Sequence, residues 1–251
     1  MSKYKIRNKL IVYGKNPVKE LIISGKSVNE VWIMDSNNSR LDDIKKLCVE
    51  KGIPFFIKNQ KEIDILNYPD HQGIVAFLEN DLPSFSSIEE FFDNTNVLEP
   101  YIFVLLDSIT DPRNFGAIFR TCDHFGITGI ISPQERSAKV NSIVFKSSSG
   151  AVNYIPHIQV KNLVRAIEYL KKRGFWIFGL DISGDKLLYD CDLKGNIGIV
   201  IGSEGEGMRR LVKESCDFLV KIPNLGHIGS LNVSVASGIT MYEIIRQRYN
   251  V

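Results

Sequence analysis

From residue 101 onward, short continuous apolar runs alternate with longer segments of helical periodicity. Short apolar runs that end at glycine, proline or polar residues predict buried strands, and longer amphipathic segments predict helices. The predicted strands are 102–106, 129–131, 175–180, 198–201 and 218–223. The predicted helices are 114–125, 163–172 and 233–248. This alternation predicts an α/β fold with a parallel sheet covered on both faces.

Residues 1–78 have the pattern of a smaller α/β unit. Asn16 is suited to cap a helix that has Pro17 at its first position. A second helix is predicted over 42–51, where Gly52 ends it. The predicted strands are 30–34, 54–57 and 73–78. The pattern alone fits a packing or dimerisation module and a substrate-docking module equally well.

Residues 79–100 differ from both flanking regions because polar turn formers dominate them. Ile88, Phe91 and Phe92 could line one face of a short helix within this stretch. We therefore predict a linker that is partly helical. The predicted organisation is a small domain at 1–78, a linker at 79–100 and a larger domain at 101–251.

Composition narrows the class of protein. Of the 251 residues, 44% are hydrophobic and 24% are charged, which is ordinary for a globular chain. The net charge of +2 argues against a strongly basic nucleic-acid coat, although a local basic face is compatible with it. The four cysteines form no CxxC pair and the four histidines show no metal-ligand spacing, so we expect inert thiols and no metal. No apolar run approaches a membrane span and the basic start has no secretory pattern, so we expect a cytoplasmic protein.

Three segments carry candidate chemistry. They read LDSITDPRNFGAIFRT at 106–121, IGSEGEGM at 201–208 and SLNVSVA at 230–236, the last preceded by Ile222 and Pro223. The glycines of the second segment are spaced G-x-x-G-x-G, which is neither the Rossmann fingerprint nor a P-loop. Glycines allow a close backbone approach to a ligand. An acidic loop of this kind repels a polyphosphate but tolerates a sulfonium cation, which favours S-adenosylmethionine over a dinucleotide.

These segments, in this order and spacing, closely resemble the three motifs of the SpoU (TrmH) family of RNA 2′-O-ribose methyltransferases, which belongs to the SPOUT class. YGKNPV at 13–18 and HQGIVA at 71–76 resemble the start and end of that family's L30e-like substrate-binding domain. The resemblance covers nearly the whole chain. It implies an L30e-like α/β domain followed by a methyltransferase domain with a deep trefoil knot, a device that is rare in proteins.

The resemblance also assigns residues. It implies that main-chain groups hold S-adenosylmethionine, with polar side chains nearby; the cofactor-binding residues are Leu180, Gly202, Ile222, Ser230 and Leu231. The catalytic residues that it implies are Arg120, Asn114, Glu204 and Asn232. Arg120 matches a family arginine proposed to help deprotonate the ribose hydroxyl. A guanidinium rarely loses its proton, so orienting a phosphate and stabilising negative charge is the easier role. Glu204 could orient Arg120 through a bidentate pair.

RNA contacts and partners complete the expectation. Arg113 and Arg136 are candidate phosphate contacts beside Arg120, because phosphates dominate RNA affinity. The likeness implies a homodimer that methylates a ribose, most simply of guanosine, in 23S-type large-subunit rRNA. Two alternatives stay open: a tRNA methyltransferase of the same family, and an RNA-binding protein without turnover. The segment at 1–78 favours rRNA over tRNA.

Overall fold

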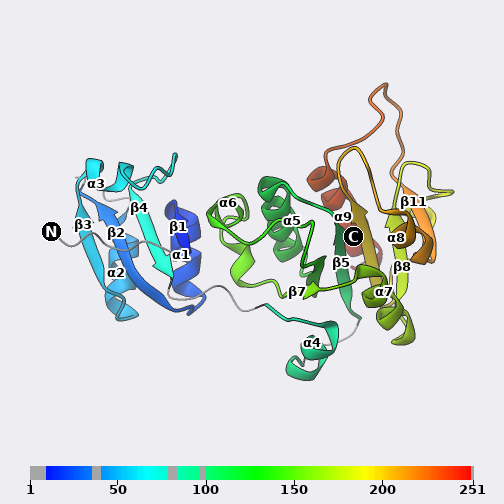
Figure 1. Ribbon diagram of the computed structural model, residues 1–251, viewed down its shortest axis with the longest axis horizontal. Coiled ribbons are helices and arrows are strands. Elements are labelled where there is room, and N and C mark those ends of the chain that lie inside the picture. The colour runs from blue at the N-terminus through cyan, green and yellow to red at the C-terminus, as the bar shows by residue number, and fades with distance from the viewer. Residues whose placement is uncertain (1–9, 36–40, 79–83, 97–99, 250–251) are drawn as a thin grey trace. The chain divides into compact units, whose positions relative to one another are not determined.

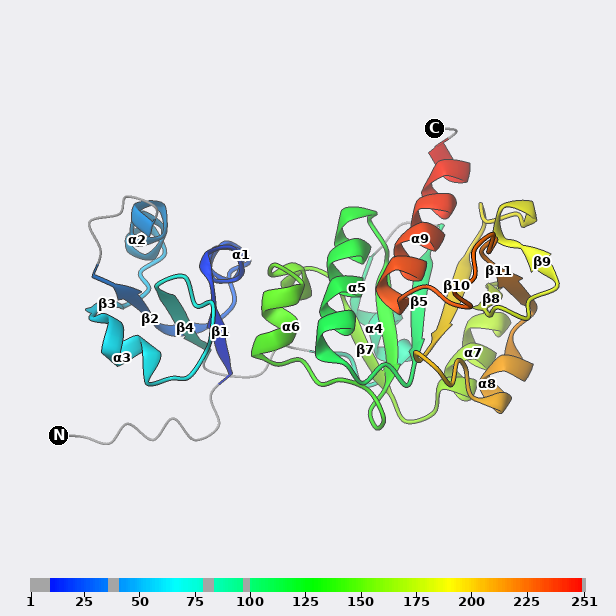
Figure 2. The same ribbon diagram turned by 90° about the horizontal axis from the view of Figure 1, so that it is seen from above.

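The computed structural model describes residues 10–35, 41–78, 84–96 and 100–249, so the basic start at 1–7 and parts of the predicted linker, 79–83 and 97–99, lie outside it. The chain forms two compact units (Figures 1 and 2). The first comprises Met1–Pro83 and Val140–Tyr154, and the second comprises Ser84–Lys139 and Ile155–Val251.

The first unit is built on a mixed four-stranded sheet in the order β1-β4-β2-β3. Its strands are β1 (Ile11–Tyr13), β2 (Val28–Met34), β3 (Phe55–Lys58) and β4 (Ile74–Leu78). Its helices are α1 (Lys15–Ile23), α2 (Asp42–Glu50), α3 (Gln60–Asp64), α6 (Ser142–Ser147) and the short 3₁₀ helix η2 (Ala151–Asn153). Strand β4 pairs antiparallel with both β1 and β2, and β2 pairs parallel with β3.

The second unit contains a seven-stranded sheet in the order β7-β6-β5-β10-β8-β11-β9, and every neighbouring pair is parallel. Its strands are β5 (Ile102–Asp107), β6 (Gly129–Pro133), β7 (His157–Val160), β8 (Trp176–Leu180), β9 (Lys186–Leu187), β10 (Ile197–Gly202) and β11 (Phe218–Lys221). Its helices are α4 (Ile88–Asn94), α5 (Pro112–His124), α7 (Leu163–Lys172), α8 (Arg210–Ser215), α9 (Val233–Tyr249) and the 3₁₀ helix η3 (Leu188–Asp190).

Helices cover both faces of this sheet, as predicted (Figure 2). α4, α7 and α8 share one face, where Phe91, Ile167 and Val212 join a single buried cluster with side chains of β5. α5 and α9 pack together on the other face, where Cys122 lies against Met241. β5 is buried throughout and β10 is buried as far as Ile201, because helices cover both faces of the parallel sheet. The parallel α/β fold is confirmed. The trefoil knot that the resemblance implies stays a prediction.

The division into units differs from the predicted domain boundaries in two places. Residues 140–154, within the predicted larger domain, belong to the first unit because α6 packs against β1 and η2 against α1. The described part of the predicted linker from residue 84 belongs to the second unit. Phe85 pairs with Ile158 at the edge of the sheet, and Phe91 is fully buried against Phe103. Apolar side chains at helical spacing therefore make this stretch part of the core.

Two predicted helix starts were wrong. The first helix begins at Lys15 with Gly14 in the capping position, so Asn16 lies inside the helix. The helix predicted from 114 begins at Pro112, and the side chain of Asp111 accepts a hydrogen bond from the backbone N–H of Arg113. An aspartate followed by proline is the stronger start signal, because proline at the first position has no N–H to satisfy. Asn114 is therefore not a cap.

Candidate active site

The candidate site lies in the second unit, where four parallel strands end at one edge of the sheet. The registers place Gly202 of β10 beside Asp107 of β5, and Ile201 beside Leu180 of β8. Strand β11 ends at Lys221, directly before Ile222. Ligands in open parallel sheets bind outside such carboxyl ends. Three of the predicted cofactor residues, Leu180, Gly202 and Ile222, therefore meet at one edge.

Gly202 is followed by a tight turn that carries Glu204. Ser203 and Gly207 exchange main-chain hydrogen bonds of 3.1 and 3.0 Å, which close the turn. Gly205 and Gly207 have positive φ angles of 89° and 70°, a conformation that side chains other than glycine rarely adopt. The backbone of Gly207 and Met208 passes so close to Gly202 that an added Cβ would lie 2.2 Å from it. The glycine spacing is therefore required by the turn itself.

Three predicted catalytic residues meet in one hydrogen-bonded network. Glu204 Oε1 accepts hydrogen bonds from Asn114 Nδ2 at 3.1 Å and Asn232 Nδ2 at 2.6 Å. Asn232 Nδ2 also donates to Asn114 Oδ1 at 3.1 Å, and the backbone N–H of Val233 donates to Glu204 at 3.2 Å. The network joins residues 90 and 118 positions apart in sequence. It fixes α5, the Glu204 turn and the start of α9 to one another.

The carboxylate of Glu204 sits at the amino end of α9. Asn232 Oδ1 accepts from the N–H and the hydroxyl of Ser234 at 3.0 and 2.6 Å, so Asn232 caps this helix. A helix amino terminus favours a nearby negative charge. Ser230 and Leu231 directly precede Asn232 in a loop from residue 223 that is exposed throughout. An exposed loop of this kind is accessible to a ligand, as a main-chain cradle for a cofactor requires.

The predicted pairing of Glu204 with Arg120 was wrong, because Glu204 binds Asn114 and Asn232 instead of the arginine. Asn114 and Arg120 are six positions apart on α5, which puts them about 120° apart around the helix. Arg113 and Arg120 are seven positions apart and within about 20° of each other. Both are exposed, and among the described residues no hydrogen bond or ion pair engages their guanidinium groups. Together they form one cationic stripe on the exposed side of α5.

Arg136 belongs to a different segment from Arg113 and Arg120. It follows β6 in an exposed turn and has a positive φ of 58°. The turn is held from within the unit by a 2.8 Å hydrogen bond from the backbone N–H of Ala138 to the carbonyl of Ile109. Ile109 belongs to the connection between β5 and α5. Arg136 is therefore exposed on a turn that is anchored to the segment leading into α5.

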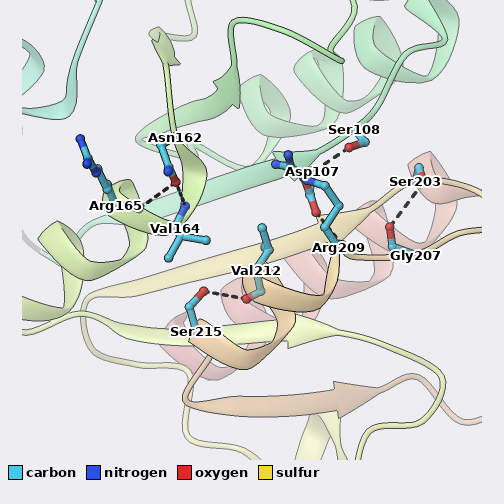
Figure 3. A network of polar contacts seen from close by, with 10 residues as sticks. All are labelled: Asp107, Ser108, Asn162, Val164, Arg165, Ser203, Gly207, Arg209, Val212 and Ser215. Atoms are coloured by element: carbon cyan, nitrogen blue, oxygen red, sulfur yellow. Dashed lines mark hydrogen bonds and ion pairs between the residues drawn. The ribbon is translucent and has the colours of Figure 1, made fainter.

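Sequence reasoning missed one charged pair at the site. Asp107 is fully buried at the end of β5 and accepts from the backbone N–H of Arg209 at 2.8 Å and from its Nε at 2.7 Å (Figure 3). Arg209 Nη2 lies 2.7 Å from the same carboxylate. A carboxylate at the end of an otherwise apolar strand was the available signal, since buried charges require partners.

The cysteines and buried histidine of the second unit lie in apolar surroundings. Burial raises the pKa of Cys216 to about 12, and it raises the pKa of Cys122 well above the ordinary value. Burial lowers the pKa of His157 to about 4, and its ring bonds to Ser132 at 2.9 Å. Within the described ranges, no group of three His, Cys, Asp or Glu side chains is arranged to hold a metal ion. No described helix is both long and apolar enough to cross a bilayer.

Known proteins match both units. The model of the SpoU rRNA Methylase family matches residues 101–242, and that of the RNA 2′-O ribose methyltransferase substrate binding family matches residues 11–82. A Staphylococcus saprophyticus protein described as a TrmH family tRNA/rRNA methyltransferase is 38% identical over 95% of this chain and 96% of its own. The 23S rRNA (guanosine-2′-O-)-methyltransferase RlmB of Pseudomonas putida is 37% identical over 94% of this chain and 96% of its own. The crystal structure of AviRb from Streptomyces viridochromogenes with AdoMet has a TM-score of 0.80 at 23% identity, covering 100% of this chain and 95% of that one.

Fold, site and sequence relatives together define an RNA 2′-O-methyltransferase that uses S-adenosylmethionine. The chain belongs to the SpoU (TrmH) family.

Proposed function

We propose that this enzyme methylates the 2′-hydroxyl of a guanosine in 23S-type large-subunit rRNA. One observation carries the proposal: the match to the Pseudomonas putida enzyme named for that reaction spans 94% of this chain, including the leading substrate-binding unit. The Staphylococcus saprophyticus relative, described by both tRNA and rRNA, makes tRNA methylation the second candidate. With ribosomal RNA as substrate, the proposed location is the cytoplasm.

The test maps ribose methylation in RNA from cells that lack the gene, with complementation by the wild-type protein or by Arg120→Ala. Loss of one guanosine methylation in large-subunit rRNA, restored only by the wild type, is the expected result. Loss of a tRNA methylation with unchanged rRNA would replace the first candidate by the second. Purified enzyme and transcripts of both RNAs give the same discrimination without the cell.

The residues at the sheet edge suit the cofactor. S-adenosylmethionine supplies an electrophilic methyl group on a sulfonium when it is bound. We assign its binding to main-chain groups of Leu180, Gly202, Ile222 and Leu231, with the Ser230 hydroxyl nearby. The fit rests on the exposed loop that precedes α9 and on the adjoining strand ends. The turn beside them carries a carboxylate, which tolerates a cation.

Arg120 is assigned to the RNA side of the reaction. With the cofactor bound, the methyl carbon would be transferred from sulfur to the ribose 2′-oxygen, S-adenosylhomocysteine would leave, and the hydroxyl proton would pass to water. A guanidinium without a carboxylate partner is free to bind the adjacent phosphate and to stabilise charge developing on the oxygen. Arg113, on the same side of α5, and Arg136 are assigned to further phosphate contacts. We assign Asn114, Glu204 and Asn232 to the geometry of the site, since they bind one another.

We also propose a homodimer, because α9 is apolar on two sides. Val233, Met241 and Ile244 are buried against its own unit. Val235, Ile239 and Tyr242 follow each other at intervals of four and three residues, so they form a second stripe. These three side chains are 49%, 39% and 54% exposed in the single chain. A stripe of this kind on a surface helix supports a protein–protein contact.

A further inference from the structure

The short helix α8 holds the site's loops through side chains that carry no assigned role. Asp107 is fully buried, whereas the side chain of Arg209 is 40% exposed. Within the described residues, Arg209 is the only ion-pair partner of Asp107, and it contacts the carboxylate through its backbone N–H, Nε and Nη2. The Ser108 hydroxyl also donates to Asp107 Oδ1 at 3.4 Å. A buried carboxylate held by all these donors has a fixed position, so it fixes the residues that contact it.

The Asp107–Arg209 pair joins the two segments that lead to the Glu204 network. Asp107 ends β5, and the chain then passes through Ser108, which has a positive φ of 64°, towards Asn114 on α5. Arg209 directly precedes α8 and follows the turn that Ser203 and Gly207 close around Glu204 (Figure 3). The pair therefore sets the distance between the connection that carries Asn114 and the turn that carries Glu204.

A second contact, made by Lys213 on α8 itself, reaches the loop at the end of β8. Lys213 Nζ lies 2.9 Å from Asp181 Oδ2 and donates to Ser183 Oγ at 2.9 Å. Asp181 directly follows Leu180, and its other carboxylate oxygen accepts from the N–H and the hydroxyl of Ser183 at 2.8 and 2.6 Å. The backbone of this loop is also fixed, because the N–H of Asp181 donates to the carbonyl of Val220 at 2.9 Å. Lys213 thus anchors the segment that begins at Leu180.

We propose that Arg209 and Lys213 are positioning residues with separate effects: Arg209 sets the Glu204–Asn114 geometry used in methyl transfer, and Lys213 sets the Leu180 loop used in cofactor binding. The inference rests on the proposed roles of Glu204 and Leu180. In this proposal, Arg209 and α8 hold the two halves of the site in place, although α8 contributes no group to the reaction.

The test separates turnover from cofactor affinity, with kcat measured at saturating S-adenosylmethionine on the RNA that the wild type methylates and cofactor Kd measured by calorimetry. Arg209→Gln is expected to lower kcat by roughly tenfold to a hundredfold with cofactor Kd within about twofold of the wild type. Lys213→Met is expected to raise cofactor Kd by roughly fivefold to tenfold with kcat within about twofold. Arg210→Gln is the matched control, because Arg210 lies on the same helix and, among the residues the structure describes, pairs only with Glu214 in an exposed contact.

Arg209→Lys keeps the charge beside Asp107 and provides a folded variant if Arg209→Gln unfolds. It is expected to show the same loss of kcat, because a lysine lacks the planar fork. Equal changes of kcat and cofactor Kd in the Arg209 and Lys213 variants, or wild-type values in both variants, would overturn the proposal of separate positioning roles. Glu204→Ala distinguishes the two levels of inference. Wild-type kcat in Glu204→Ala would contradict the proposed role of Glu204 in the site. An inactive Glu204→Ala together with a fully active Arg209→Lys would contradict only the positioning role of Arg209.

Discussion

The substitution Gly202→Ala tests whether the backbone packing around the Glu204 turn sets catalytic geometry. An added Cβ would lie 2.2 Å from the carbonyl carbon of Gly207 and from the nitrogen of Met208. Ordinary van der Waals contact begins at 3.4 Å, so the two segments must separate by about 3.4 − 2.2 = 1.2 Å. Both obstructing atoms are backbone, so no side-chain rotation relieves the contact. The turn that carries Glu204 has to move.

A displacement of about 1 Å in a positioned group costs about a hundredfold in rate, so we expect kcat to fall by that order. Overpacking of this kind costs roughly 1–3 kcal/mol, which corresponds to a fall in Tm of about 3–10 °C for a unit of this size. The assays are steady-state methyl transfer and thermal unfolding. Gly195→Ala is the matched control, because an added Cβ at that position meets nothing within 4 Å. Wild-type kcat and Tm in Gly202→Ala would show that the turn accommodates the methyl group and would refute the reasoning.

Three further outcomes are expected. Arg120→Ala should reduce methyl transfer by at least about a hundredfold while cofactor Kd, measured by calorimetry, stays near the wild-type value, since the guanidinium is assigned to the RNA side; full activity would contradict that role. Ile239→Glu places a charge in the exposed stripe of α9, so it should convert the proposed dimer to a monomer, as measured by light scattering after gel filtration. The control Val49→Glu changes a 71% exposed side chain in the other unit and should leave the dimer intact. Burial lowers the pKa of His157 from 6.5 to about 4. As the pH falls, the unfolded chain therefore binds a proton at this histidine before the folded chain does. The free energy of unfolding should be highest above pH 6.5 and should fall by up to about 3 kcal/mol as the pH drops to 4. Urea unfolding at several pH values in this range measures how the free energy of unfolding depends on pH. This dependence should become weaker in His157→Gln, and an unchanged dependence in that variant would contradict the burial effect.

The accuracy of the sequence predictions followed the length and regularity of each element. The strand predicted at 102–106 and the helix predicted at 163–172 agree closely with β5 and α7, because both patterns are strong. The short elements α6 and α8 were not predicted, since six residues give too few turns for periodicity to show. The assignment of α6 to the first unit depends on tertiary packing, which no local pattern records.

The candidate site shows the same contrast between residue identity and residue partner. Motif resemblance selected Asn114, Glu204 and Asn232, and the structure brings them together. It did not reveal that Asp107 and Arg209 pair, because the two residues are 102 positions apart and neither has a local pattern that names the other. A buried charge at a strand end predicts that a partner exists, but only the fold specifies which residue it is.

Helical phase alone could have excluded the Glu204–Arg120 pair. Asn114 and Arg120 are six positions apart and therefore point to different sides of α5, and the carboxylate of Glu204 binds Asn114 and not Arg120. This separation has a chemical consequence. A carboxylate on Arg120 would neutralise it and compete with a phosphate, whereas the observed arrangement satisfies Glu204 with amide donors. The asparagines therefore spare Arg120 from pairing with Glu204, which its proposed contact with an RNA phosphate requires, and Arg113 adds a second positive charge on the same side of the helix.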